Sequence, residues 1–357
     1  MCKKINILLG LFLCSVSCIA QIPAIDSVVK SEMEKRHVVG LSLAILADDR
    51  VIVHKGYGFA DIANSKPASS ETIYKIGSIS KQFIATNIMA LAEQGKLSLS
   101  DHIYKYFPDA PDEWRDITIR NLLNHTSGIE RESPAFKWMK RQPDSVLIEA
   151  TYKDKLHFAT GTKWEYSNMG YFILADIIRK VSGQSFEDYM NNFFIRCGMN
   201  NTVTTDKSTG PEKAKGYVYN EKSGKSIEEP DLIALRPSGA FSSSIDDMMK
   251  WDSILRSGTI LTKEDWAKMW GDTVHTGEVA KGQMDYYGYG WRVRLLRNKH
   301  RLVFHGGSEP GFISEYWRYI DDGIAIIVLT NSSDIDAVES ISKKIAIQLN
   351  RSASIKK

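Results

Sequence analysis

The chain has 357 residues, an ordinary globular composition and a formal net charge of +3. This length supports one large domain or two closely joined ones. The near-neutral charge excludes a strongly basic nucleic-acid-binding surface, and the eight histidines lack any His-Glu-x-x-His or comparable ligand spacing. We therefore expect no cofactor, no metal and no nucleic-acid partner.

Residues 1–20 resemble a secretory signal peptide, with a short basic region followed by an apolar stretch. The stretch is too short to span a bilayer comfortably, which takes about 20 residues. We expect cleavage after Ala20, a secreted or periplasmic protein, and no stable membrane insertion. The weaker alternative is a lipoprotein anchored through Cys18. Cleavage leaves 44 basic against 43 acidic residues, and Cys197 as a lone, buried structural thiol.

Hydrophobic periodicity predicts strands at both ends of the chain and helices between them. The N-terminal part predicts a helix over 24–36, strands over 41–46 and 51–54 that turn at Asp48-Asp49 and end at 56–58, and a helix over 83–97. The middle predicts helices over 119–124, 145–150, 171–181 and 186–194. The last part predicts strands over 289–296, 302–305, 313–319 and 324–330, and a helix over 335–349.

This order predicts an α+β fold in which an antiparallel sheet, built from both ends of the chain, is flanked by helices and carries an inserted helical lobe. The expected parts are a signal peptide (1–20), a discontinuous sheet lobe (21–97 and 236–351), the helical lobe (98–235) and a tail (352–357). The crevice between two such lobes is the expected place for a site.

Ser78-Ile79-Ser80-Lys81 is a candidate nucleophile motif, because a serine and a lysine three apart lie on one helix face. The same spacing occurs at Ser27/Lys30, Ser340/Lys343 and Ser354/Lys357. We favour Ser78, since Gly77 permits a tight approach and an apolar helix follows. A helix N-terminus there stabilises negative charge.

Two further groups are candidate partners of Ser78. Tyr166-Ser167-Asn168 precedes a predicted helix, and its rival Tyr189-Met190-Asn191 lies inside an apolar helix where packing is the simpler role. His305-Gly306-Gly307-Ser308 ends a predicted strand, and its rival His275-Thr276-Gly277 falls in an expected loop. His125 is interpreted as a helix-end residue that bonds backbone.

Taken in order, Ser-x-x-Lys, Tyr-x-Asn and His-x-Gly resemble the motifs of the serine beta-lactamase and penicillin-binding-protein-like superfamily. The resemblance is closest to its class C beta-lactamase, D,D-carboxypeptidase and esterase branch. It covers almost the whole mature chain, including 122–128 and Leu329-Thr330-Asn331.

The resemblance implies roles residue by residue. Ser78 would be the acylated nucleophile, Lys81 and Tyr166 would share general acid and base work, and Asn168 would orient Lys81 and the substrate. Gly307 belongs to the strand that binds substrate, and the oxyanion would be held by the backbone N–H groups of Ser78 and Ser308. His305 stands where class C beta-lactamases carry a lysine, and a histidine supplies less positive charge at neutral pH.

The leading hypothesis is a secreted serine hydrolase that acts through an acyl-enzyme on an ester, a small amide or a D-amino-acid peptide. Three alternatives remain: acyl transfer to an alcohol or amine, beta-lactam hydrolysis, and a sensor that is acylated without turnover. An alpha/beta-hydrolase is rejected because the chain has no Gly-x-Ser-x-Gly elbow. The expected partner is a small acyl substrate, and the oligomeric state is left open.

Overall fold

The computed structural model describes residues 22–354 except 49, 138–139, 141, 205–209, 211, 232–240 and 282, and only the backbone of 350–354. The predicted signal segment with Cys18, and part of the predicted tail, lie outside the described residues. No helix within the described ranges is long and apolar enough to cross a membrane. No group of three or more His, Cys, Asp or Glu side chains there is arranged to hold a metal ion.

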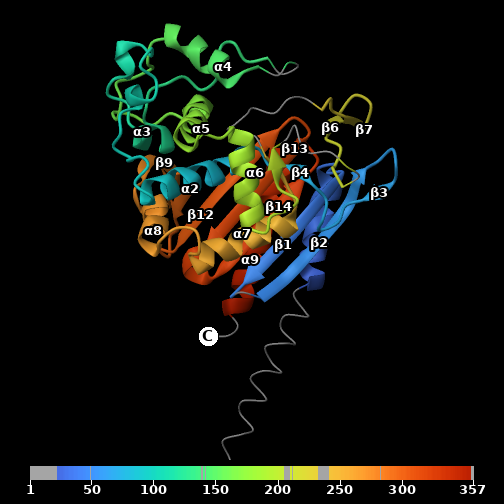
Figure 1. Ribbon diagram of the computed structural model, residues 1–357. Coiled ribbons are helices and arrows are strands. Elements are labelled where there is room, and N and C mark those ends of the chain that lie inside the picture. The colour runs from blue at the N-terminus through green and yellow to red at the C-terminus, as the bar shows by residue number, and fades with distance from the viewer. Residues whose placement is uncertain are drawn as a thin grey trace, which may run out of the picture.

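One antiparallel sheet forms the centre of the described chain, and strands from both ends of the sequence meet in it (Figure 1). At this meeting point Leu41 lies opposite Thr330 and Ala47 lies opposite Ile324. The strands follow the spatial order β3 (Lys66–Pro67), β2 (Arg50–Asp61), β1 (Gly40–Ala47), β14 (Ile324–Thr330), β13 (Phe312–Tyr319), β12 (Arg301–Glu309), β11 (Arg292–Leu295), β10 (Gln283–Tyr287) and β9 (Val274–Ala280).

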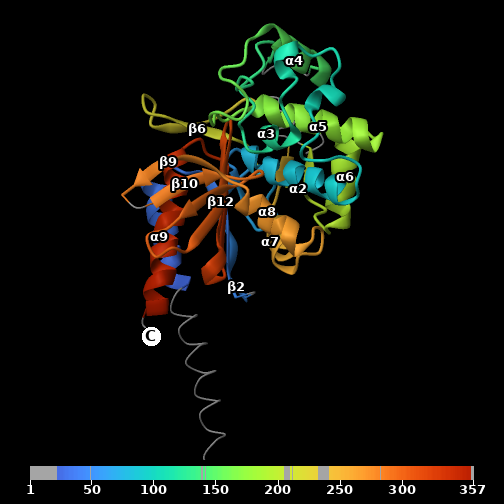
Figure 2. The ribbon, with the colours of Figure 1, turned by 90° about the vertical axis from the view of Figure 1, so that its left-hand side faces the viewer.

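Helices cover both faces of this sheet (Figure 2). One face packs against the helix over residues 22–35 and α9 (Ile335–Ser354), and the other against α2 (Ser80–Glu93), α7 (Ile245–Ser257) and α8 (Lys263–Gly271). Because side chains alternate along a strand, the central strands are apolar on both sides. In β1, Leu43 and Ile45 pack on the side of the N-terminal helix and α9, while Ala44 and Leu46 pack on the side of α2, α7 and α8.

The remaining helices form a lobe above one end of the sheet (Figure 1). Three of its helix starts are capped, because Thr118, Ser167 and Ser185 each accept a hydrogen bond from the first turn that follows. Its helices and 3-10 turns are η2 (Ile103–Lys105), η3 (Asp112–Trp114), α3 (Ile119–Leu123), α4 (Asp144–Ala150), η4 (Thr151–Lys153), α5 (Asn168–Ser182) and α6 (Phe186–Arg196).

The other elements are short. They are the small sheet of β4 (Tyr74–Lys75), β8 (Phe241–Ser243) and β5 (Val203–Thr204), the hairpin of β6 (Tyr217–Asn220) and β7 (Lys225–Glu228), the turn η1 (Gly77–Ile79) that leads into α2, and the turn η6 (Ile320–Asp322) between β13 and β14.

The predicted α+β class, with an antiparallel sheet, flanking helices and a helical lobe, is confirmed. The predicted end of the first hairpin at 56–58 is wrong, because β2 continues to Asp61. Gly58 pairs with Gly40 there, and a Cβ on Gly56 would lie 2.1 Å from the Ala68 carbonyl oxygen. Glycine in this strand therefore permits close backbone contact rather than a turn.

Five strands and helices of the last third were not predicted: β8, β9, β10, α7 and α8. The loop predicted at His275 is wrong, since β9 contains this residue. The closing helix also runs to Ser354 rather than 349. β9 is an edge strand with partly exposed side chains, so it lacks the apolar alternation that identifies a buried strand.

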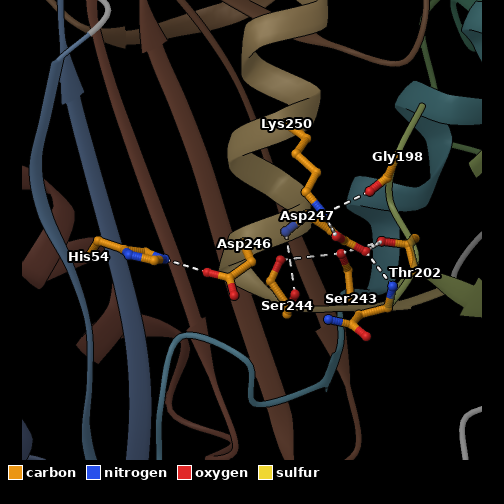
Figure 3. Close-up of polar contacts among 9 residues, drawn as sticks. His54, Gly198, Thr202, Ser243, Ser244, Asp246, Asp247 and Lys250 are labelled. Carbon is orange, nitrogen blue, oxygen red and sulfur yellow. Dashed lines mark hydrogen bonds and ion pairs between the residues drawn. The ribbon is translucent and has the colours of Figure 1, made fainter.

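A buried carboxylate joins the start of α7 to the turn that follows α6 (Figure 3). Asp247 is fully buried, and its Oδ2 accepts hydrogen bonds from Asn201 N at 2.7 Å and Thr202 Oγ1 at 2.9 Å. Its Oδ1 lies 2.8 Å from Lys250 Nζ. The neighbouring Asp246 is more exposed and bonds the ring of His54.

We expect Asp247→Asn to lower the free energy of unfolding by about 3 kcal/mol, because it leaves buried donors without their charged acceptor. Asp246→Asn is the matched control and should cost about 1 kcal/mol or less, as exposed ion pairs and helix-end charges do. Urea unfolding followed by circular dichroism measures both. Equal losses in the two variants would contradict this account of the α7 start.

Candidate active site

A cavity of about 900 Å³ lies where the helical lobe meets the sheet. It collects residues that are more than two hundred positions apart in the sequence. Its lining includes six of the seven predicted site residues, and the seventh, Lys81, is fully buried beside them. The six are Ser78, Tyr166, Asn168, His305, Gly307 and Ser308.

Ser78 lies in η1, the short 3-10 turn between β4 and α2. Gly77 enters this turn with a φ of +50°, in the left-handed region that favours glycine. A Cβ on Gly77 would lie 2.6 Å from the backbone nitrogen of Ser308. The missing side chain therefore lets the serine turn pack directly on β12.

β12 makes the other half of this contact. A Cβ on Gly307 would lie 1.9 Å from the Ile76 carbonyl oxygen, and Ser314 Oγ donates a hydrogen bond of 2.9 Å to the same oxygen. The predicted strand end at His305 is wrong, because β12 pairs with β13 as far as Glu309. β11 pairs with β12 only between Arg301 and Phe304, so the later residues of β12 border the cavity.

A chain of polar groups runs from Ser78 into the helical lobe. Lys81 Nζ lies 3.0 Å from Ser78 Oγ and 2.8 Å from Asn168 Oδ1. Asn168 Nδ2 in turn donates to Glu132 Oε1 at 2.5 Å. Burial lowers the pKa of Lys81, while Tyr166 and Glu132 oppose this shift. The amine is thus held next to the hydroxyl in a water-poor setting that disfavours its charged form.

Tyr166 lies over the same lysine, directly before the start of α5. Lys81 Nζ is 4.9 Å from the centre of its ring, and the Arg131 guanidinium is 5.2 Å from it. Ser167 caps α5 and Asn168 is its first residue. One helix start therefore presents both Tyr166 and Asn168 to the buried lysine.

His305 is buried and held in one tautomer. Its Nδ1 lies 2.6 Å from the Gly306 carbonyl oxygen, so it carries the hydrogen, and its Nε2 accepts from Tyr287 OH at 2.9 Å. Burial, together with the charges of Arg292 and Lys81, lowers the pKa of His305 to about 3. The ring is therefore neutral at neutral pH and does not replace a lysine as a cation.

Three residues of this site were missed by the sequence analysis: Glu132, Tyr287 and Arg292. Glu132 extends the Lys81–Asn168 chain, Tyr287 holds the His305 ring, and Arg292 lines the cavity next to Trp164. Each of the three reaches the site only through the tertiary packing of the chain. No local spacing distinguishes them from other charged or aromatic residues.

The rival motifs fall elsewhere in the fold. Ser340 Oγ donates to Glu32 at 2.6 Å, while Lys343 pairs with Glu339. Ser27 and Lys30 lie on the N-terminal helix, and Lys357 falls outside the described residues. Tyr189 lies in α6 and packs against the core, as predicted.

Comparison with known proteins places the whole fold in one family. The model of the beta-lactamase family matches residues 25–348. Penicillin-binding protein 4* of Bacillus subtilis is 29% identical over 84% of this chain and 70% of its own length. Protein flp of Staphylococcus aureus is 28% identical over 86% of this chain, which spans only 62% of that protein.

Solved structures agree. The octameric penicillin-binding protein homologue from Pyrococcus abyssi superposes with a TM-score of 0.81 at 28% identity, covering 92% of this chain and 77% of that one. D-amino acid amidase from Ochrobactrum anthropi gives 0.79 at 22% identity over 93% and 99%. The chain belongs to the beta-lactamase family and is a hydrolase of the serine beta-lactamase and penicillin-binding-protein fold.

We expect Gly307→Ala to slow acylation of Ser78 by about 100-fold, because its Cβ would push η1 away from β12, and an ångström of misplacement costs that much. Gly306→Ala is the neighbouring control, since its Cβ would meet only the end of the Glu315 side chain, at 2.8 Å. Burst kinetics with an activated ester compare the two. Equal rates in both variants would contradict the proposed role of the contact.

Proposed function

We propose that this protein is a serine hydrolase that forms an acyl-enzyme on Ser78 with an ester, a small amide or a D-amino-acid peptide. The observation that carries the proposal is the buried amine of Lys81, 3.0 Å from Ser78 Oγ and 2.8 Å from Asn168 Oδ1. A serine is a weak nucleophile until an adjacent base accepts its proton.

The proposed reaction has two halves. Ser78 Oγ attacks the carbonyl carbon while its proton passes to Lys81, and the backbone N–H groups of Ser78 and Ser308 receive the developing oxyanion. The bond to the leaving alcohol or amine breaks, and the leaving group takes a proton by way of Tyr166. Water then attacks the acyl carbon and passes a proton to the neutral amine of Lys81. The bond between that carbon and Ser78 Oγ breaks, the carboxylic acid leaves, and the serine regains its proton from the amine.

The charges of the cavity bear on the substrate. The neutral His305 leaves Arg292 and Arg131 as the guanidinium groups of the lining, against the carboxylates of Glu132 and Glu165 among others. Such a site suits substrates that carry both an amine and a carbonyl, because the carboxylates can bind the amine and the guanidinium groups can donate hydrogen bonds to the carbonyl oxygen. The fold shared with D-amino acid amidase fits this class, and the neutral histidine argues against a specialised beta-lactamase.

The signal-like segment 1–20 supports an enzyme that works outside the cytoplasm. An intact mass matching a chain that starts at Gln21 would agree with this placement, and retention of the full 357 residues would not.

Labelling tests the nucleophile. After exposure to a fluorophosphonate, mass spectrometry should find one adduct on Ser78, and Ser78→Ala should remain unlabelled and inactive. Tyr166→Phe should reduce kcat/KM for a D-amino-acid amide by about 100-fold or more, as expected for loss of the general acid that protonates the leaving amine. An adduct on another serine would refute the assignment, and a burst without further turnover would indicate a sensor instead.

The pH profile tests the base. Because burial lowers the pKa of Lys81, we expect kcat/KM to rise with pH through an inflection below the usual lysine value, as the neutral amine becomes available. The same inflection should persist in His305→Gln, since His305 is already neutral above about pH 3. If kcat/KM instead fell across this pH range, the charged form of Lys81 would be required, and Tyr166 would be the group that accepts the Ser78 proton.

A further inference from the structure

His125 is a buried imidazole next to Tyr166 that the proposed reaction does not use. It follows α3 in the loop 124–128 and has a φ of +61°, which is unusual for a residue with a side chain. Only 1% of its surface is exposed. A strained and fully buried polar residue needs a reason, and its contacts supply one.

The backbone and the ring of His125 hold the two residues on either side of Tyr166. The His125 carbonyl oxygen accepts a hydrogen bond from Glu165 N at 3.0 Å. Its ring Nδ1 accepts one from Ser167 N at 3.2 Å. Because a backbone N–H can only donate, Nδ1 is unprotonated and the hydrogen is on Nε2.

The ring also packs against the tyrosine itself. The centre of the His125 ring lies 4.3 Å from that of Tyr166 and 4.5 Å from that of Tyr287, whose hydroxyl holds His305. Burial and the charge of Lys81 place the pKa of His125 well below the ordinary value. A neutral ring keeps Nδ1 available as an acceptor and adds no second positive charge beside Lys81.

We propose that His125 is a positioning residue that fixes Tyr166 against Lys81 and Ser78. This inference rests on the proposed function, because it assigns His125 to the proton transfer of Tyr166. The hydrogen bond to Ser167 N fixes the backbone after Tyr166, and the hydrogen bond to Glu165 N fixes the backbone before it. The imidazole ring of His125 packs against the ring of Tyr166. The positive φ of His125 lets both its carbonyl oxygen and its Nδ1 face the backbone of residues 165–167.

A pair of substitutions separates positioning from mere filling of space. In His125→Asn, the amide oxygen occupies the place of Nδ1, and asparagine tolerates a positive φ. In His125→Gln, the amide reaches the place of Nε2 and offers no acceptor to Ser167 N. We expect kcat/KM to stay within about five-fold of wild type in the first variant and to fall about 30-fold or more in the second. The exposed His102→Gln is the matched control and should be unchanged.

A double-mutant cycle with Tyr166→Phe gives the decisive readout. Single-turnover release of the amine from a D-amino-acid amide is measured in all four proteins, since departure of an amine requires the proton that Tyr166 is proposed to deliver. If His125 acts through the Tyr166 hydroxyl, His125→Gln should have little further effect once that hydroxyl is absent. The same loss in both backgrounds would overturn the proposal, as would equal losses in the Asn and Gln variants. Absence of Ser78 labelling in the wild type would instead refute the proposed function.

Discussion

The site depends on one contact without side chains, between the η1 turn and β12. Gly77 and Gly307 meet there so closely that a Cβ on either would collide with the backbone of the other element. Ser314 secures the turn by donating to the Ile76 carbonyl oxygen. This contact brings Ser78 and Ser308 together from opposite ends of the chain, and it explains why the sheet must be assembled from both ends before a site exists.

The second constraint is electrostatic. Lys81 is buried and donates a hydrogen bond to Asn168, which in turn donates one to Glu132. The carboxylate of Glu132, in the helical lobe, therefore balances the charge of the lysine. The imidazoles of His305 and His125 are neutral because burial and this same lysine oppose their protonation. In a low-dielectric site, one ionisable amine next to Ser78 is easier to tune than several interacting cations.

Local spacings in the sequence selected residues that the fold brings to one cavity, whereas the bounds of some elements that carry them were wrong. Ser-x-x-Lys, Tyr-x-Asn and His-x-Gly are local spacings, and their order along the chain singled out Ser78 from four equivalent matches. The strand through His305 was ended too early, because Gly306 and Gly307 suggest a break unless a neighbouring turn is known to pack on them. Glu132, by contrast, joins the site only through tertiary contacts, which no local pattern reports.

The two lobes therefore hold the residues of the candidate site in different ways. In the proposed reaction, the sheet lobe supplies Ser78 and the edge of β12, which are held by backbone contacts that leave no room for a side chain. The helical lobe supplies Tyr166 and Asn168 from the capped start of α5, where the fixed geometry comes from hydrogen bonds to the 124–128 loop. Lys81 belongs to the first lobe but is oriented by the second. A displacement of either lobe would separate the Lys81 amine from Asn168, on which its orientation beside Ser78 depends.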